Sequence, residues 1–152
     1  MILISPYSQK LRNGERNPKN FPSWEAVVYK LTTLGYEVIQ VGVTGEESIK
    51  GVKGVLFNSS LDELKKLILE CQTWVGIDNF FPHLCNIVGK SGVVVYSKSD
   101  PTIFGYSSNT NLLKDRKYLR EFPFDIWEKI SYDLEAFVTP SEVVAEIVKK
   151  LI

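Results

Sequence analysis

Five short apolar runs divide the chain and predict buried strands. They lie at residues 1–5, 36–43, 55–57, 74–77 and 92–96. Runs of this length without polar alternation are typical of strands that are covered on both faces, as in a parallel sheet. Residues 97–125 show no comparable pattern, and we expect that stretch to be mostly irregular.

The segments between these runs carry apolar side chains at the three- and four-residue spacing of amphipathic helices. Four helices are predicted, starting near Ser23, Ser60, Asp78-Asn79 and Thr139. Ser60 and Thr139 are each followed three residues later by glutamate, which is the capping box that begins a helix. Because strands and helices alternate, residues 1–152 are predicted to form a single Rossmann-like α/β domain whose parallel sheet has helices on both faces.

Length and composition limit the classes of protein that fit. With 152 residues the chain has room for about one domain, and its 18 Lys and Arg cancel its 18 Asp and Glu. This balance argues against a general nucleic-acid binder. No apolar run approaches the roughly 18 residues of a membrane span, and the opening MILIS is too short for the apolar core of a signal peptide. We therefore expect a cytoplasmic protein without a membrane span.

Candidate metal ligands are few. Cys71 and Cys85 form no CxxC pair and sit at apolar positions of predicted helices, and His83 is the only histidine. These features argue against a disulfide framework, a zinc site and a multi-histidine metal site. A catalytic pair that includes histidine would have to use His83.

Ligands of an open parallel sheet bind beyond the carboxyl ends of the strands, so the segments that follow strands are the candidates. There are four of them, at residues 8–20, 42–47, 78–83 and 97–105. The first carries four basic residues against one acidic residue, and the third opens a helix whose free N–H groups favour anions. Together they predict a site for a phosphate or diphosphate. The GxGxxG and GxxxxGK[ST] patterns are absent, which argues against a dinucleotide site and against ATP hydrolysis.

Residues 77–101, IDNFFPHLCNIVGKSGVVVYSKSDP, resemble the hallmark segment of family 9 glycosyltransferases, the ADP-heptose:lipopolysaccharide heptosyltransferases. The family pattern is D-[ST]-G-x-x-H-L, then G-K-P, then a strand that ends near D-P. The register is gapless, and the matching positions are Asp78, His83, Leu84, Gly89, Lys90, Asp100 and Pro101. Three further segments resemble family elements in the same order: residues 19–22 (K-x-W-P), 42–47 (G-G-x-G-E-E) and 137–143 (I-[ST]-x-E-E-V).

This resemblance implies the C-terminal half of a GT-B glycosyltransferase, the half that binds the nucleotide-sugar donor. The donor positions that it implies are Lys19, Asp78, Asn79, Phe80 and His83 around the diphosphate, and Glu46 and Glu47 near the nucleoside. The substrate or ligand is then a nucleotide-diphosphate sugar, with no other cofactor. The chain departs from the family at Phe80, which replaces a glycine that lets the backbone approach a phosphate, and at Asn79, which replaces a hydroxyl residue.

The acceptor half, which supplies the catalytic carboxylate of that family, has no counterpart in these 152 residues. We therefore expect sugar transfer to require an acceptor-domain partner chain or self-association, and no catalytic residue is assigned. Two other hypotheses stay open. One is a non-catalytic protein that binds or sequesters a nucleotide or nucleotide sugar, and the other is an inactive scaffold whose cleft is filled by Phe80 and Phe81. The retained Lys19, Asp78 and His83 argue against the scaffold.

Each candidate residue also has a purely structural explanation. Asp78 fits an N-cap of its helix, His83 fits a structural residue of a first helical turn, and Glu46-Glu47 fits an ordinary acidic turn. The basic loop at residues 8–20 fits a solvated loop. The aromatic residues that are expected in the core, in preference to a base-stacking platform, are Trp74, Phe80 and Phe81.

Overall fold

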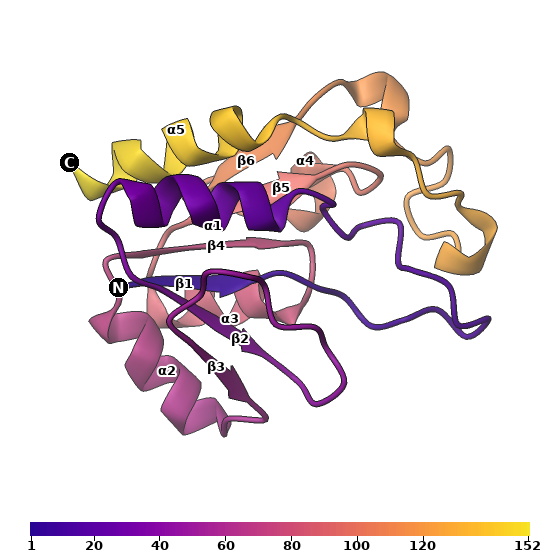
Figure 1. The fold of residues 1–152 in the computed structure, drawn as a ribbon. Coiled ribbons are helices and arrows are strands. Elements are labelled where there is room, and N and C mark those ends of the chain that lie inside the picture. The colour runs from indigo at the N-terminus through magenta and orange to yellow at the C-terminus, as the bar shows by residue number, and fades with distance from the viewer.

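Six parallel strands form one sheet in the computed structural model, which describes residues 1–152. In sequence order the strands are β1 (Ile2–Ser5), β2 (Val38–Gly42), β3 (Gly54–Phe57), β4 (Thr73–Ile77), β5 (Val93–Tyr96) and β6 (Thr110–Leu113). Their order across the sheet is β3-β2-β1-β4-β5-β6, which confirms the predicted Rossmann-like fold (Figure 1). The strand order reverses between β1 and β4, and a crevice at the carboxyl ends of these two strands is the usual ligand site of such sheets.

Helices cover both faces of the sheet, as predicted. α1 (Trp24–Thr33) and α5 (Pro140–Leu151) lie together on one face, and α2 (Leu61–Glu70) and α3 (Phe80–Val88) lie on the other (Figure 1). The remaining helical segments are short, and they are α4 (Pro101–Phe104) and the 3-10 turns η1 (Arg116–Tyr118), η2 (Trp127–Lys129) and η3 (Leu134–Ala136). No helix has the length and apolar character that crossing a membrane would need.

Both predicted capping boxes are confirmed. The Ser60 hydroxyl accepts a hydrogen bond from Glu63 N at 3.2 Å, and the Glu63 carboxylate accepts one from Ser60 N at 2.9 Å. Thr139 and Glu142 form the same pair of bonds at the start of α5. Each N-cap side chain satisfies an N–H group that the helix leaves free, which contributes about 1 kcal/mol to stability.

Side chains that alternate along the strands enter two separate cores. Ile2 and Ile4 of β1 pack with α1 and α5, whereas Leu3 packs with α2 and α3. In the second core Trp74 and Phe81 are fully buried and meet edge to face, with ring centroids 5.6 Å apart. The prediction that these two aromatic residues belong to the core is confirmed.

Residues 97–125 contain more regular structure than predicted. β6 pairs with β5 along its whole length, and α4 begins at its N-cap, Asp100. β6 has the sequence TNLL, lies at the edge of the sheet, and is only partly buried at all four positions. A half-covered edge strand needs no continuous apolar run, so the hydrophobic pattern gave no indication of this strand.

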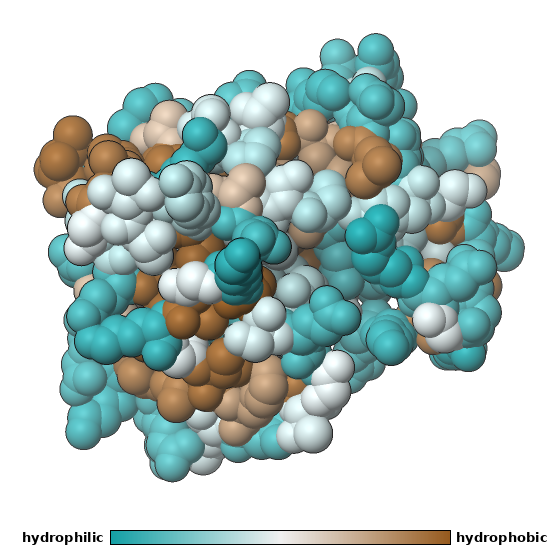
Figure 2. Space-filling model, in the orientation of Figure 1, coloured by the Kyte–Doolittle hydropathy of each residue, from teal (hydrophilic) through white to brown (hydrophobic).

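The connection between β2 and β3 contains no helix, and residues 43–53 lie against the sheet in its place. Gln40 of β2 is fully buried and holds this segment, because its Nε2 donates to Glu47 O and its Oε1 accepts from Ile49 N, both at 2.8 Å. Figure 2 shows apolar side chains below α1 on this side of the molecule, where a loop covers the strands. A buried amide in the sheet therefore sets the position of the acidic turn.

Candidate functional site

The carboxyl ends of β1 and β4 are joined by hydrogen bonds from the start of α3. Asn79 donates through Nδ2 to Ser5 Oγ and to Tyr7 O, both at 3.1 Å, and its Oδ1 accepts from Phe81 N at 3.0 Å. Asn79 is thus the N-cap of α3, and the alternative in which Asp78 caps this helix is wrong. The Asp78 carboxylate makes no hydrogen bond within the chain, so it remains free for another partner.

The basic loop at residues 8–20 is held by the amide side chains within it. Asn20 Oδ1 accepts from Ser8 N at 2.8 Å, and Asn17 Nδ2 donates to Gln9 O at 3.1 Å. Asn17 Oδ1 also accepts from Lys19 N at 3.0 Å. These bonds take the place of regular secondary structure and determine where Lys19 lies relative to the sheet.

Two cations share one aromatic ring at the carboxyl end of the sheet. Lys19 Nζ lies 5.1 Å from the centroid of the Trp127 ring, and Arg120 Cζ lies 3.9 Å from the same centroid. Arg120 also donates to Asp125 O at 2.6 Å. Neither cation has a carboxylate oxygen within 4.0 Å. Cation–π contacts hold the two side chains without neutralising them, so the pair can receive an anion.

Asp78 is electrostatically coupled to both cations. Burial lowers the pKa of Lys19, the negative charge of Asp78 opposes that shift, and the positive charge of Arg120 adds to it. Burial also lowers the pKa of Arg120, and the negative charges of Asp78 and Asp125 oppose that shift. The structure therefore brings the predicted residues Lys19 and Asp78 into one charged cluster with Arg120.

Sequence reasoning missed Arg120 and Trp127. Both follow β6, in a stretch without hydrophobic periodicity. The available signal was composition, because residues 114–132 interleave five basic with five aromatic residues, and such a mixture favours cation–π contacts. Arg116 ties this segment to the start of α4, because its guanidinium donates to both carboxylate oxygens of Asp100 at 3.1 and 2.7 Å.

A cleft of about 650 Å³ lies between the basic loop and the turn after β2. Lys10 and Arg16 line one side, and Glu46 and Glu47 line the other. Arg16 lies over the Tyr132 ring, with Cζ 3.6 Å from the centroid, and neither Lys10 nor Arg16 has a carboxylate within 4.0 Å. The cleft thus presents free cations opposite two carboxylates.

The predicted site residues fall into two adjoining groups. Glu46 and Glu47 line the cleft, whereas Lys19 and the predicted residues of the α3 segment do not. Asn20, the neighbour of Lys19, does line it. The charged cluster around Lys19 therefore lies next to the cleft, and the two together span the carboxyl ends of β1, β2 and β4.

Glu46 folds back over the turn that carries it. Its Oε1 accepts from Val43 N at 2.9 Å, and its Oε2 is buried without a hydrogen-bond partner. Gly42 makes this fold possible, because a Cβ at that position would lie 2.9 Å from Oε2. Burial raises the pKa of Glu46, and the bond from Val43 N opposes the shift. The unpaired oxygen thus lies inside the turn, against Gly42.

Phe80 lies on the exposed face of α3, whereas the sequence predicted it in the core. The Phe80 side chain is 53% exposed, so its assignment to the core is wrong, because the first position of α3 faces outward. Phe81, in contrast, is buried beneath the helix and cannot fill a surface cleft. The expectation that Phe81 fills the cleft is therefore wrong, and the hypothesis of an inactive scaffold stays open.

The start of α3 offers fewer free N–H groups than the sequence suggested. The N–H of Phe81 already donates to the Asn79 side chain, and Pro82 has no N–H group. His83, in the first turn, is exposed, and its Nδ1 lies 2.7 Å from the Tyr106 hydroxyl. The sequence showed no partner that could orient this histidine, since Tyr106 is 23 residues away and meets it only through the fold.

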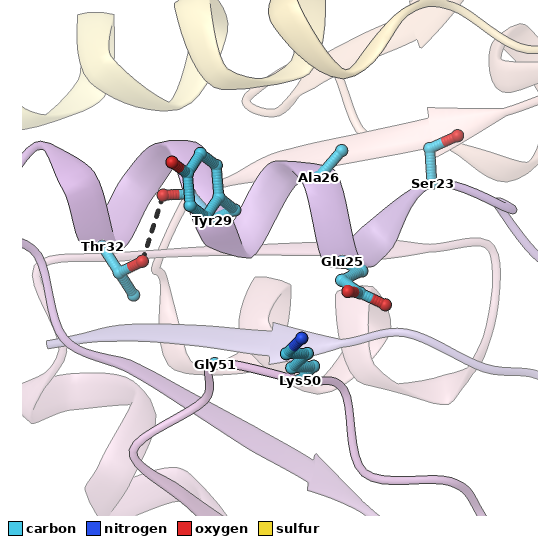
Figure 3. A pocket seen from close by; sticks show the side chains of 7 residues that line it. All are labelled: Ser23, Glu25, Ala26, Tyr29, Thr32, Lys50 and Gly51. Atoms are coloured by element: carbon cyan, nitrogen blue, oxygen red, sulfur yellow. Dashed lines mark hydrogen bonds between the residues drawn. The ribbon is translucent and has the colours of Figure 1, made fainter.

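A second groove, of about 590 Å³, lies between α1 and residues 50–51 (Figure 3). Its lining residues are Ser23, Glu25, Ala26, Tyr29, Thr32, Lys50 and Gly51. None of the predicted site residues is among them. The chain also contains no group of three or more His, Cys, Asp or Glu side chains arranged to hold a metal ion.

By sequence the chain matches no protein-family model and no curated protein. Its fold matches solved glycosyltransferases. The glycosyl transferase family 9 protein from Veillonella parvula aligns with 99% of this chain at a TM-score of 0.73 and 16% identity. The E. coli ADP-heptose lps heptosyltransferase II aligns with 99% at 0.69 and 18%, and the E. coli heptosyltransferase WaaC with ADP aligns with 98% at 0.68 and 16%.

These matches cover 46%, 46% and 43% of the three glycosyltransferase chains, so this chain spans less than half of their length. Nearly all of this chain is included in each match. The chain therefore has the fold of one GT-B-like half, and the fold implied by the resemblance is confirmed.

Proposed function

We propose that this chain binds a nucleotide-diphosphate sugar and acts as the donor-binding half of a glycosyltransferase. The observation that carries the proposal is a set of cations at the carboxyl end of the sheet that form no ion pair with a carboxylate: Lys10, Arg16, Lys19 and Arg120. A diphosphate supplies the negative charge that this set lacks, through charge-assisted hydrogen bonds. The carboxyl end of a parallel sheet is also the usual ligand site of this fold class.

The acidic wall of the cleft suits the nucleoside. A ribose presents neighbouring hydroxyl groups, and the exposed Glu47 carboxylate on this wall can accept hydrogen bonds from them. In this proposal the nucleoside lies beside Glu46 and Glu47, and the diphosphate extends toward Lys19 and Arg120.

The remaining predicted residues have different roles in this proposal. Lys19 and Arg120 stabilise the charge that develops on the leaving diphosphate. Asn79 supports the site by joining β1 to β4, because its side chain already makes three hydrogen bonds. Phe80 and His83 lie on the exposed face of α3, where the sugar of the donor would meet them.

Sugar transfer also needs an acceptor side, which we propose is supplied by a partner chain or by a second copy of this chain. Exposed apolar side chains occur in the segment that carries Arg120 and at the start of α3, and they are Phe80, Phe122, Phe124 and Ile126. Residues 7–20 and 115–130 extend from the same end of the sheet (Figure 1). Exposed apolar side chains that gather beside a binding site are typical of a protein contact surface.

Titration calorimetry of the purified chain tests the donor site. We expect ADP or UDP, or their sugars, to bind. The nucleoside alone should bind far more weakly. Absence of heat and of any spectral change with all of these ligands at millimolar concentration would overturn the proposal and favour the inactive scaffold.

A non-catalytic nucleotide-sugar binder is the second candidate, because every residue of the proposed site serves the donor. A transfer assay and light scattering separate the two candidates. For a donor-binding half, the chain alone should not transfer sugar, and transfer should appear together with an assembled partner or oligomer. The non-catalytic binder would be favoured if the chain binds the donor, stays a monomer at high concentration and captures no partner from its native host.

A further inference from the structure

The single histidine of the chain meets a tyrosine at the edge of the proposed site. His83 Nδ1 lies 2.7 Å from Tyr106 Oη, and the two rings meet edge to face with centroids 5.4 Å apart at 79°. His83 is exposed, and it lies one helical turn from Phe80 on the outer face of α3. Its other ring nitrogen, Nε2, makes no hydrogen bond within the chain.

Tyr106 is held in place by its own backbone. Its carbonyl oxygen accepts from Asn111 Nδ2 at 3.0 Å and from Asn109 N at 3.1 Å. The Tyr106 hydroxyl has no hydrogen-bond partner other than His83. The phenol is therefore dedicated to one ring nitrogen of the histidine.

Chemistry decides the direction of this hydrogen bond. A neutral imidazole has one N–H and one bare nitrogen, and a phenol can donate or accept. A phenolic O–H is a stronger acid than a neutral imidazole N–H and is the better donor of the two. The favoured arrangement has Tyr106 Oη donating to Nδ1 of His83, which puts the imidazole proton on Nε2.

We propose that Tyr106 is a positioning residue that fixes His83 as an outward-facing hydrogen-bond donor. In neutral His83 the tyrosine holds the Nε2–H tautomer. In protonated His83 the hydroxyl rotates and accepts from Nδ1–H, and Nε2–H still faces outward. His83 thus presents the same donor in both charge states. The identity of the acceptor rests on the proposed function: Nε2–H donates to an oxygen of the bound nucleotide-diphosphate sugar.

Nitrogen-15 NMR of the ligand-free chain tests the tautomer, and the spectrum is unambiguous because the chain has one histidine. At about pH 9, well above the ordinary histidine pKa of about 6.5, we expect a protonated Nε2 and a bare Nδ1. Tyr106→Phe should give a mixture of tautomers, whereas Tyr29→Phe, a matched change on the exposed face of α1, should leave the spectrum unchanged. A protonated Nδ1 in the wild type, or an unchanged tautomer in Tyr106→Phe, would overturn the proposal.

Binding of ADP and ADP-sugars tests the role of the donor. Tyr106→Phe should weaken binding about two- to tenfold, as expected for one hydrogen bond, and should cause no further loss in a His83→Ala background. Equal losses in both backgrounds would show that Tyr106 acts independently of His83, against the proposal. If no nucleotide binds to the wild type, the proposed function fails, and the tautomer measurement still decides whether Tyr106 orients His83.

Discussion

Replacing Lys19 with alanine removes one cation from the proposed diphosphate site and leaves the fold in place. The side chain is partly buried against the Trp127 ring and forms no ion pair, so its loss breaks no internal salt bridge. Its backbone N–H keeps its bond to Asn17. A change in ligand binding would therefore report on the ammonium group.

The expected loss of affinity follows from the charge. A hydrogen bond to a charged group contributes about 1.5–3 kcal/mol, which corresponds to about a 10- to 150-fold weaker Kd for a nucleoside diphosphate. Two features favour the lower half of this range. Arg120 shares the Trp127 ring and still faces the diphosphate, and removing Lys19 relieves the repulsion between the two cations. The loss should shrink as salt rises, because ions screen a partly exposed charge pair.

Calorimetric titration of ADP and of adenosine into wild type and Lys19→Ala measures this effect. ADP binding should weaken and adenosine binding should not, since the cation contacts the phosphate and not the base. Lys50→Ala, which removes an exposed cation below α1 (Figure 3), is the matched control and should bind ADP like wild type.

The pH dependence gives a second measure of the same group. Burial and Arg120 lower the pKa of Lys19 below its ordinary 10.5, so wild-type affinity for ADP should fall as pH rises toward that value. Lys19→Ala should lack this component. The reasoning is refuted if Lys19→Ala weakens ADP and adenosine equally, or if ADP binding is unchanged at low salt.

Three further changes test other parts of the structure. Phe80→Gly should tighten ADP binding, because a glycine lets the backbone approach a phosphate more closely than a phenylalanine does, and weaker binding measured by calorimetry would show instead that the ring contacts the ligand. The Arg116 guanidinium holds the pKa of Asp100 at about 2. The stabilisation that Arg116→Ala removes should therefore be present above about pH 4 and be lost as pH falls through 2. A difference in urea midpoint between wild type and variant that does not change with pH would contradict this. Gly92→Ala should destabilise the fold by about 1–3 kcal/mol or more, because the new Cβ would lie 2.3 Å from the Trp74 ring, and an unchanged melting temperature would refute that packing.

Local patterns were sufficient for most of the fold. The apolar runs marked five strands, and the boxes at Ser60 and Thr139 marked two helix starts, because strand burial and helix capping depend on residues a few positions apart. The same patterns failed for β6 and for Phe80. An edge strand and the first residue of a helix are only partly covered, so their residue types do not reveal their positions.

The sequence by itself determined the order of the elements, the parallel sheet, and the placement of Lys19, Asp78 and Glu46 after strands, where ligands of such sheets bind. Only the tertiary structure decided which side chains meet there. Trp127 and Arg120 reach Lys19 across about 100 residues of chain, and Tyr106 reaches His83 across 23. Contacts of this kind depend on how an irregular segment folds back over the sheet, and no periodicity in the sequence encodes that path.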